Sequence, residues 1–305
     1  MRNTLRAASC DLSFQLAGLA GRRPAAIAAA QRVLGQKQLV FCVTNGRSGS
    51  KTLARLLDCL QQVQSQHEPA PSFHLIMRWA QNNAALAENF WLYQKLPAIA
   101  DCHKPIYLET SHLFAKGFIE PLLELGGRPK IIFLSRDLRA TAMSMLMLND
   151  IPGRTRRALK WYLSPSDALC AGLRPGQAET FSDYQLCYWH ALEMQARQKH
   201  YSGLAAKHGL TTVAADVSGL NSMAGIEAIC AALAIGITAE DDARLRKLVG
   251  IRENTRKQEK TASLVYTGDH DAEEEELRSS IIEVDTGARR RAGIDRYIST
   301  AWRGL

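Results

Sequence analysis

The sequence predicts an α/β fold in which a central parallel sheet of about four to five strands is flanked by helices. Four short apolar runs indicate the sheet, because strands that are buried on both faces are apolar throughout. Segments with helical periodicity separate these runs along the chain, as the crossovers of a parallel sheet require. The chain has 305 residues, of which 46% are hydrophobic, so it can bury the core of one large α/β domain.

The first predicted strand, residues 39–44, leads into a short loop and then a helix. The strand reads Leu-Val-Phe-Cys-Val-Thr, and the loop after it contains Gly46 and Gly49. Leucines at positions 53, 56, 57 and 60 then recur at the spacing of one helix face. The unit is therefore strand, glycine-containing loop and helix.

The same kinds of element continue along the chain. Strands are expected over residues 105–109, 130–135 and 210–215, with helices over 111–125, 137–148, from 183 onward and around 226–233. Residues 149–182 are rich in Pro, Gly, Ser and Arg and are expected to form a loop or a helical insertion beside the site. The acidic run 273–276 is expected to begin a solvated helix. We therefore expect residues 39–305 to form a single domain.

The net charge of +8 is concentrated in two parts of the chain. Residues 1–38 carry six basic residues and one acid, and residues 128–160 carry eight basic residues and two acids. A localised positive field favours an anionic ligand. Residues 1–38 are expected to form a basic, helical N-terminal arm that could contact an acidic membrane surface peripherally.

Cysteine usage and hydropathy exclude several classes of protein. The seven cysteines include no C-x-x-C pair, so neither a zinc ribbon nor a dithiol redox site is indicated. No stretch of about 18 apolar residues exists, and the N-terminus lacks the pattern of a secretory signal. We expect a cytoplasmic protein with no bound metal and no nucleic-acid partner. The N-terminal arm could associate it with a membrane.

The loop after the first strand has the composition of an anion site. Backbone amides at the start of a helix converge on one point, where the helix dipole adds partial positive charge. A Walker A loop would need glycines at positions 45 and 50, where this chain has Asn45 and Ser50. An ordinary nucleotide triphosphatase is therefore disfavoured. Charge and hydroxyl groups for an anion come from Arg47, Ser48, Ser50, Lys51 and Thr52.

The string Arg47-Ser48-Gly49-Ser50 resembles the 5′-phosphosulfate loop of sulfotransferases that use 3′-phosphoadenosine 5′-phosphosulfate (PAPS). That loop commonly reads Pro-Arg/Lys-Ser-Gly-Ser/Thr-Thr; here Lys51 replaces the usual Thr. The resemblance is to bacterial and carbohydrate-type members, covers roughly residues 39–235 and implies a P-loop-like three-layer fold. It also implies PAPS as co-substrate, without a metal, bound through Arg47, Ser48, Gly49, Ser50, Lys51 and Thr52.

A second motif follows the third predicted strand. Arg136 and Asp137 leave that strand, and Ser144 lies eight residues after Arg136. This pattern resembles the family's 3′-phosphate site, in which an Arg and a Ser on the following helix bind the phosphate. An Arg offers a planar fork of donors to phosphate oxygens, and Ser adds a hydroxyl. Asp137 could equally cap the helix.

Candidates for a general base come from two places. His67-Glu68-Pro69 resembles a Glu-Pro of carbohydrate sulfotransferases that ends a short strand facing the acceptor. Glu68 is the first candidate and His67 the second, because either could take a proton from an acceptor hydroxyl. His112 is a third. It follows Glu109-Thr110-Ser111, which resembles the family's Glu-Lys-Ser/Thr-Pro, and Lys104 or Lys51 could supply the missing lysine charge.

Further nucleotide contacts are expected from the basic segment 252–257, through Arg256 and Lys257. The aromatic run around residues 184–190 is expected to be mainly core, with lining of the acceptor cleft as the alternative. The resemblance implies transfer of a sulfuryl group from PAPS to a hydroxyl or amine, on an acceptor that could be a glycan or a lipid. Two alternatives stay open: a kinase that uses ATP and Mg²⁺ through Asp216 and Glu109, and a non-enzymatic protein that binds anionic surfaces.

Overall fold

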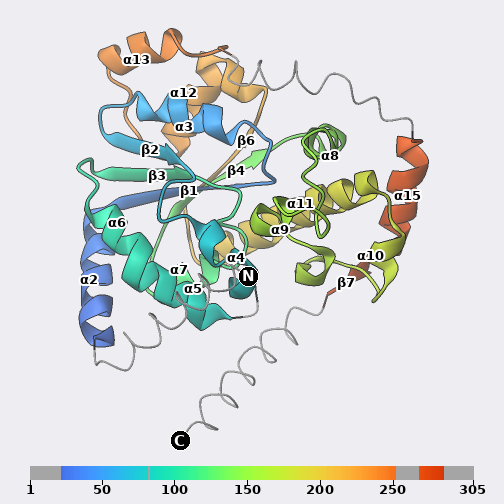
Figure 1. The fold of residues 1–305 in the computed structure, drawn as a ribbon. Coiled ribbons are helices and arrows are strands. Elements are labelled where there is room, and N and C mark those ends of the chain that lie inside the picture. Colours follow the sequence, from blue (N-terminus) through green and yellow to red (C-terminus); the bar gives the residue numbers. More distant parts are fainter. Residues whose placement is uncertain (1–21, 82, 252–267, 285–305) are drawn as a thin grey trace, which may run out of the picture.

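A five-stranded parallel sheet forms the centre of the computed structural model, which describes residues 22–81, 83–251 and 268–284 (Figure 1). The strand order is β2-β3-β1-β4-β6, so β1 lies in the middle. The strands are β1 Gln38–Thr44, β2 Val63–His67, β3 Ile106–Thr110, β4 Lys130–Ser135 and β6 Thr212–Asp216. The predicted α/β fold with a parallel sheet of four to five strands is confirmed.

Helices cover both faces of this sheet. One face packs against α3 (Ser50–Asp58), α12 (Met223–Ala232) and α13 (Ala239–Arg246). The other faces a larger layer made of α2 (Arg23–Gln36), α4 (Met77–Ala80), α5 (Ala84–Phe90), α6 (Leu96–Ala100), α7 (Ile119–Glu124) and α11 (Asp183–Lys207). Alternation along β1 produces this division, because Val40 and Cys42 belong to the first core and Phe41 and Val43 to the second.

The register brings the carboxyl ends of the strands to one edge. Thr110 of β3 pairs with both Cys42 of β1 and His67 of β2, and Ser135 of β4 pairs with Asp216 of β6. The chain runs from β1 to one side for β2 and β3 and to the other for β4 and β6. Ligands of open α/β sheets bind at such a reversal, outside the carboxyl ends of the strands.

The predicted helix over residues 111–125 is wrong for its first half. Residues 112–117 form turns, and only α7, Ile119–Glu124, is helical. Gly117 adopts φ +94°, a left-handed value that a continuous helix cannot contain. Strand β2 was not among the predicted strands, because it has no apolar run: of its side chains, only those of Val63 and Ser65 are buried.

The segment 149–182 folds into short pieces held against α11. It contains α9 (Ala158–Trp161), the 3₁₀ turn η3 (Pro165–Asp167), β5 (Ala171–Gly172) and α10 (Gln177–Thr180). The carboxylate of buried Glu193 on α11 accepts hydrogen bonds from the backbone amides of Leu169, Cys170 and Ala171. This anchor fixes the segment beside the carboxyl edge of the sheet.

Two further α-helices are α8, Leu138–Leu146, and α15, His270–Ser280. The described residues also form the 3₁₀ turns η1, Phe73–Leu75, and η4, Gly219–Asn221, and the π-helical turn η2, Trp91–Lys95. The short strand β7, Ile282–Glu283, pairs antiparallel with β5. No helix among the described residues is long and apolar enough to cross a bilayer. Membrane contact of residues 1–38 stays a prediction, since 1–21 lie outside the described residues, and so does the single domain over 39–305.

Candidate functional site

The loop between β1 and α3 is held in an unusual backbone conformation. Gly46, Arg47 and Gly49 have φ of +81°, +57° and +80°. Gly49 caps α3, and the carbonyl of Gly49 accepts the amide of Leu53. Below the loop, the buried hydroxyls of Thr44 and Ser48 are hydrogen bonded to each other. Left-handed residues before a helix turn successive amides toward one side, which is the backbone arrangement of an anion site.

The fold brings the second predicted phosphate motif against this loop. Arg47 donates from Nε to Ser144 Oγ on α8 at 3.0 Å, and Arg136 donates from Nη1 to the carbonyl of Arg47. Burial lowers the pKa of Arg136, and the neighbouring guanidinium of Arg47 lowers it further. Two half-buried guanidinium groups this close repel each other, so an anion between them would be favourable.

The other residues of the two motifs lie on the helices that follow the loops or outside the described residues. Lys51 and Thr52 are on the first turn of α3, beside buried Ser50; Lys51 is exposed and Thr52 is half-buried. Asp137 caps α8 by accepting the amide of Ala140 at 2.7 Å, so the capping alternative also holds. Arg256 and Lys257 lie outside the described residues.

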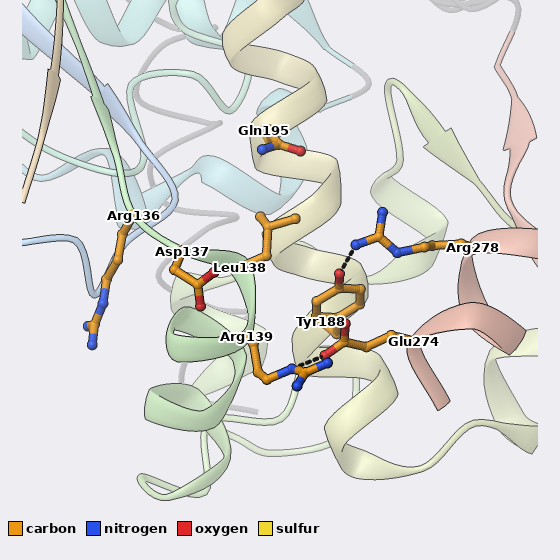
Figure 2. A pocket seen from close by; sticks show the side chains of 8 residues that line it. All are labelled: Arg136, Asp137, Leu138, Arg139, Tyr188, Gln195, Glu274 and Arg278. Atoms are coloured by element: carbon orange, nitrogen blue, oxygen red, sulfur yellow. Dashed lines mark hydrogen bonds and ion pairs between the residues drawn. The ribbon is translucent and has the colours of Figure 1, made fainter. Parts of the chain in front are cut away.

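Arg139, in the same basic stretch, belongs to a different surface. Its Nε donates to Glu274 Oε1 of α15 at 2.7 Å, and its side chain also pairs with Asp271. Figure 2 shows Arg136 and Arg139 pointing to opposite sides of the start of α8. Between α8, α11 and α15 lies an open pocket of about 470 Å³ whose lining includes both arginines. Part of the positive charge of this stretch is thus neutralised by the acidic helix α15.

The three candidate bases lie together at the ends of β2 and β3. Glu68 Oε1 is 3.3 Å from His112 Nε2, and Glu68 Oε2 is 3.9 Å from His67 Nε2. The backbone of Glu68 is left-handed, at φ +50°, and its amide donates to the carbonyl of Thr110. Burial raises the pKa of Glu68 to about 7, a value suited to exchanging protons near neutral pH.

His112 joins the base candidates to the loop. A Cβ added to Gly46 would lie 3.2 Å from His112 Cγ, so the imidazole packs directly on the loop backbone. Burial and the nearby Lys116 lower the pKa of His112 well below its usual value, so its ring is neutral. His67 uses Nδ1 toward the carbonyl oxygen of Thr110, at 2.9 Å.

Four residues that the sequence reasoning did not name as catalytic or nucleotide-binding form the inner wall of the site. Buried Lys116 contacts His112 and His190, and the rings of Trp161 and Tyr162 lie beside His112. The only local signal was the spacing of four residues between His112 and Lys116. Trp161 and Tyr162 come from the insertion expected beside the site, and His190 comes from the aromatic run considered for the acceptor cleft; only the tertiary fold shows which side chains of these segments reach His112.

The lysine expected beside Glu109 comes from elsewhere in the chain. Lys95 Nζ lies 2.6 Å from Glu109 Oε2, and both side chains are fully buried. Lys104, one of the two suggested sources, instead donates to the backbone carbonyls of Leu60 and Val63. Because Glu109 is paired with Lys95, it is not available as a metal ligand.

Asp216, the other carboxylate considered for a metal, accepts from the hydroxyl of Ser218 and the amide of Gly219. Within residues 22–81, 83–251 and 268–284, no group of three or more His, Cys, Asp or Glu side chains is arranged to hold a metal ion.

Comparison with known proteins gives little similarity. The sequence matches no protein-family model and no curated protein sequence. Among solved structures, the sulfotransferase STF1 from Mycobacterium tuberculosis H37Rv matches with 11% identity and a TM-score of 0.39, over 77% of this chain and 82% of that one. A match with so low a TM-score carries no argument about function.

Proposed function

We propose that this protein is a sulfotransferase that moves a sulfuryl group from PAPS to a hydroxyl or amine of an acceptor. The observation that carries the proposal is the contact of Arg47 with Ser144 and Arg136. These residues belong to two motifs, separated along the chain, that resemble the 5′- and 3′-phosphate sites of PAPS enzymes. Their meeting at the carboxyl edge of the sheet fits a ligand that carries both phosphates.

The residues present fit such a nucleotide. Arg47, Lys51 and the loop amides would hold the 5′-phosphosulfate, and Arg136 with Ser144 would hold the 3′-phosphate. When bound, PAPS supplies an activated sulfuryl group and leaves as adenosine 3′,5′-bisphosphate. Arg47 and Lys51 then stabilise the negative charge that develops on the bridging phosphate oxygen, a role of positioned cations in group transfer.

Glu68 is the best-supported general base among the three candidates. His112 directs Nε2 toward Glu68 and Nδ1 toward Lys116, so neither ring nitrogen is left to take a proton from the acceptor substrate. Glu68 Oε2 lies 3.9 Å from His67 Nε2, too far for a hydrogen bond, and can accept a proton. The acceptor oxygen forms its bond to sulfur, the bond between sulfur and the phosphate oxygen breaks, and the acceptor proton goes to Glu68.

The side chains near Glu68 favour an acceptor with an apolar face beside its hydroxyl, as glycans and lipids have. Trp161 is packed on His74 with a centroid distance of 4.3 Å, and both side chains are half-buried. The ring of Tyr162 lies beside His112, with a centroid distance of 5.1 Å. Flat rings of this kind pack against the apolar faces of ligands while the polar groups hold the hydroxyl.

The kinase alternative has less support, because Glu109 is held by Lys95. Calorimetry separates the two proposals: we expect binding of adenosine 3′,5′-bisphosphate without Mg²⁺, and weaker binding of adenosine 5′-monophosphate. Transfer of ³⁵S from labelled PAPS to extracts of lipids, glycans and phenols then identifies the acceptor. Absence of bisphosphate binding, or Mg²⁺-dependent binding of ATP in its place, contradicts the proposal.

A further inference from the structure

Lys116 is a fully buried lysine whose ammonium group has three hydrogen-bond partners. Its Nζ lies 3.0 Å from the carbonyl oxygen of Trp161, 3.0 Å from His112 Nδ1 and 3.3 Å from His190 Nε2. The ring of Tyr162 lies beneath it, with Nζ 5.2 Å from the ring centroid. An ammonium group has three donors and no acceptor, so the three partners match its three N–H bonds.

A charged Lys116 in this arrangement would select one tautomer of each histidine. Because Lys116 donates to His112 Nδ1, the proton of the neutral His112 ring is on Nε2, which faces Glu68 Oε1 at 3.3 Å. His190, whose pKa burial lowers well below its usual value, likewise accepts at Nε2 and carries its proton on Nδ1. His190 Nδ1 is buried with no hydrogen-bond partner among the described residues, so Lys116 is the contact that orients this ring.

We propose that Lys116 is a positioning residue that holds His112 in the Nε2–H tautomer, so that His112 donates to Glu68 and keeps it a carboxylate. The role rests on the proposed function of Glu68 as the base. One oxygen of Glu68 is thereby bound by His112, which directs the other oxygen toward the acceptor. Lys116 touches no reacting atom itself and acts through His112.

The charges around these groups act in opposite directions. Burial, Arg197 on α11 and Arg78 on α4 lower the pKa of Lys116, whereas Glu68 and Glu193 raise it. The three acceptors and the tyrosine face favour the charged form. At Glu68, burial and Glu109 raise the pKa, whereas Lys116 and Arg157 lower it. Removing Lys116 therefore removes both the donor that fixes His112 and a nearby cation that opposes protonation of Glu68.

The tautomer is measured directly in the full-length wild-type chain with ¹⁵N-labelled histidine. We expect the ¹⁵N chemical shifts of His112 to show a proton on Nε2 and a lone pair on Nδ1, assigned with the variant His112→Gln. In Lys116→Met, the ¹⁵N shifts of His112 should indicate a mixture of the Nε2–H and Nδ1–H tautomers. A wild-type ring protonated on Nδ1 overturns the proposal, and this readout does not depend on any enzymatic activity.

The pH profile of transfer gives the second readout. In Lys116→Met, the acid limb of kcat/KM should move upward by about one pH unit, because Glu68 loses a cation and a donor. Lys199→Met removes the same charge from an exposed site on α11 and should leave the limb in place. An unmoved limb in folded Lys116→Met overturns the proposal. If that variant does not fold, the ¹⁵N measurement of the His112 tautomer in the wild-type chain tests the proposal alone. A wild-type protein without transferase activity contradicts the proposed function and leaves the tautomer result valid.

Discussion

Arg47 and Ser144 lie 97 positions apart in the chain and are joined by a hydrogen bond of 3.0 Å from Arg47 Nε to Ser144 Oγ. Arg47 follows β1, and Ser144 lies on α8 after the neighbouring strand β4. Parallel pairing of these strands places both chain ends at one edge of the sheet. The contact thus links the two motifs that the sequence suggested as phosphate sites.

Replacing either guanidinium of this pair should weaken nucleotide binding. Arg47→Ala and Arg136→Ala should each reduce the affinity for adenosine 3′,5′-bisphosphate by about 10- to 100-fold, because a charge-assisted hydrogen bond contributes about 1.5–3 kcal/mol. Calorimetry measures the change. Arg139→Ala is the matched control, since Arg139 pairs with α15, and it should bind normally. Equal losses in all three variants would point to bulk charge and not to a site.

Removing the carboxylate of Glu68 should separate catalysis from nucleotide binding. We expect Glu68→Gln to lower kcat by about 100-fold or more, since general-base catalysis contributes factors of about 10² to 10⁴. Affinity for the bisphosphate should stay within about twofold, because Glu68 contacts His112 and not the loop cations. Steady-state kinetics with calorimetry on the same preparation tests both. An unchanged kcat would transfer the role of base to His67.

The same substitution should stabilise the protein in a pH-dependent way. Burial raises the pKa of Glu68 from 4.5 to about 7, so the folded state favours the protonated carboxyl. Its stability contribution is complete below pH 4.5 and is lost as the pH rises through 7. Relative to wild type, Glu68→Gln should therefore gain about 2–3 kcal/mol at pH 8 and little at pH 4. Urea denaturation at both pH values measures this, and an equal effect at both contradicts the pKa shift.

A methyl group at Gly46 should disturb both the loop and His112. The added Cβ would lie 3.2 Å from His112 Cγ, and φ of +81° is strained for alanine. We expect Gly46→Ala to lower stability by about 1–3 kcal/mol and to reduce turnover by displacing His112 from Glu68. Gly35→Ala on α2 is the control, because nothing lies within 4 Å of its Cβ. That control should be neutral or stabilising in thermal melts.

The buried pair of Lys95 and Glu109 should respond differently to single and double substitution. Lys95→Met leaves a buried carboxylate without its cation and should cost about 3–5 kcal/mol. In Lys95→Met with Glu109→Gln, much of that loss should return, since no uncompensated charge remains. Denaturant unfolding of the four proteins in the cycle gives the coupling energy. Simple additivity of the two substitutions would show that the pair does not interact.

Much of the fold could be predicted from the sequence because its signals are local. Apolar runs and helical spacing located β1, β3, β4 and β6 and the helices after β1, β4 and β6, whereas after β3 only α7 was located. The edge strand β2 was signalled only by the family-like Glu-Pro after it, because three of its five residues are only half-buried and it lacks an apolar run. In residues 111–125 the helical pattern was interrupted by Gly117, whose left-handed backbone is not visible as a break in apolar periodicity.

The sequence by itself determined the order along the chain of most strands and helices, the position of the glycine loop and the residues that could bind an anion. Only the tertiary structure decided which polar groups meet: Arg136 with the carbonyl of Arg47, Lys95 with Glu109, Arg139 with Glu274, and Lys116 with His112. The periodicity of apolar residues indicates which face of a helix or strand is buried, and it can be recognised in a short stretch of sequence. The charge state and hydrogen bonds of a buried group depend on partners brought from distant segments, and no local pattern encodes them.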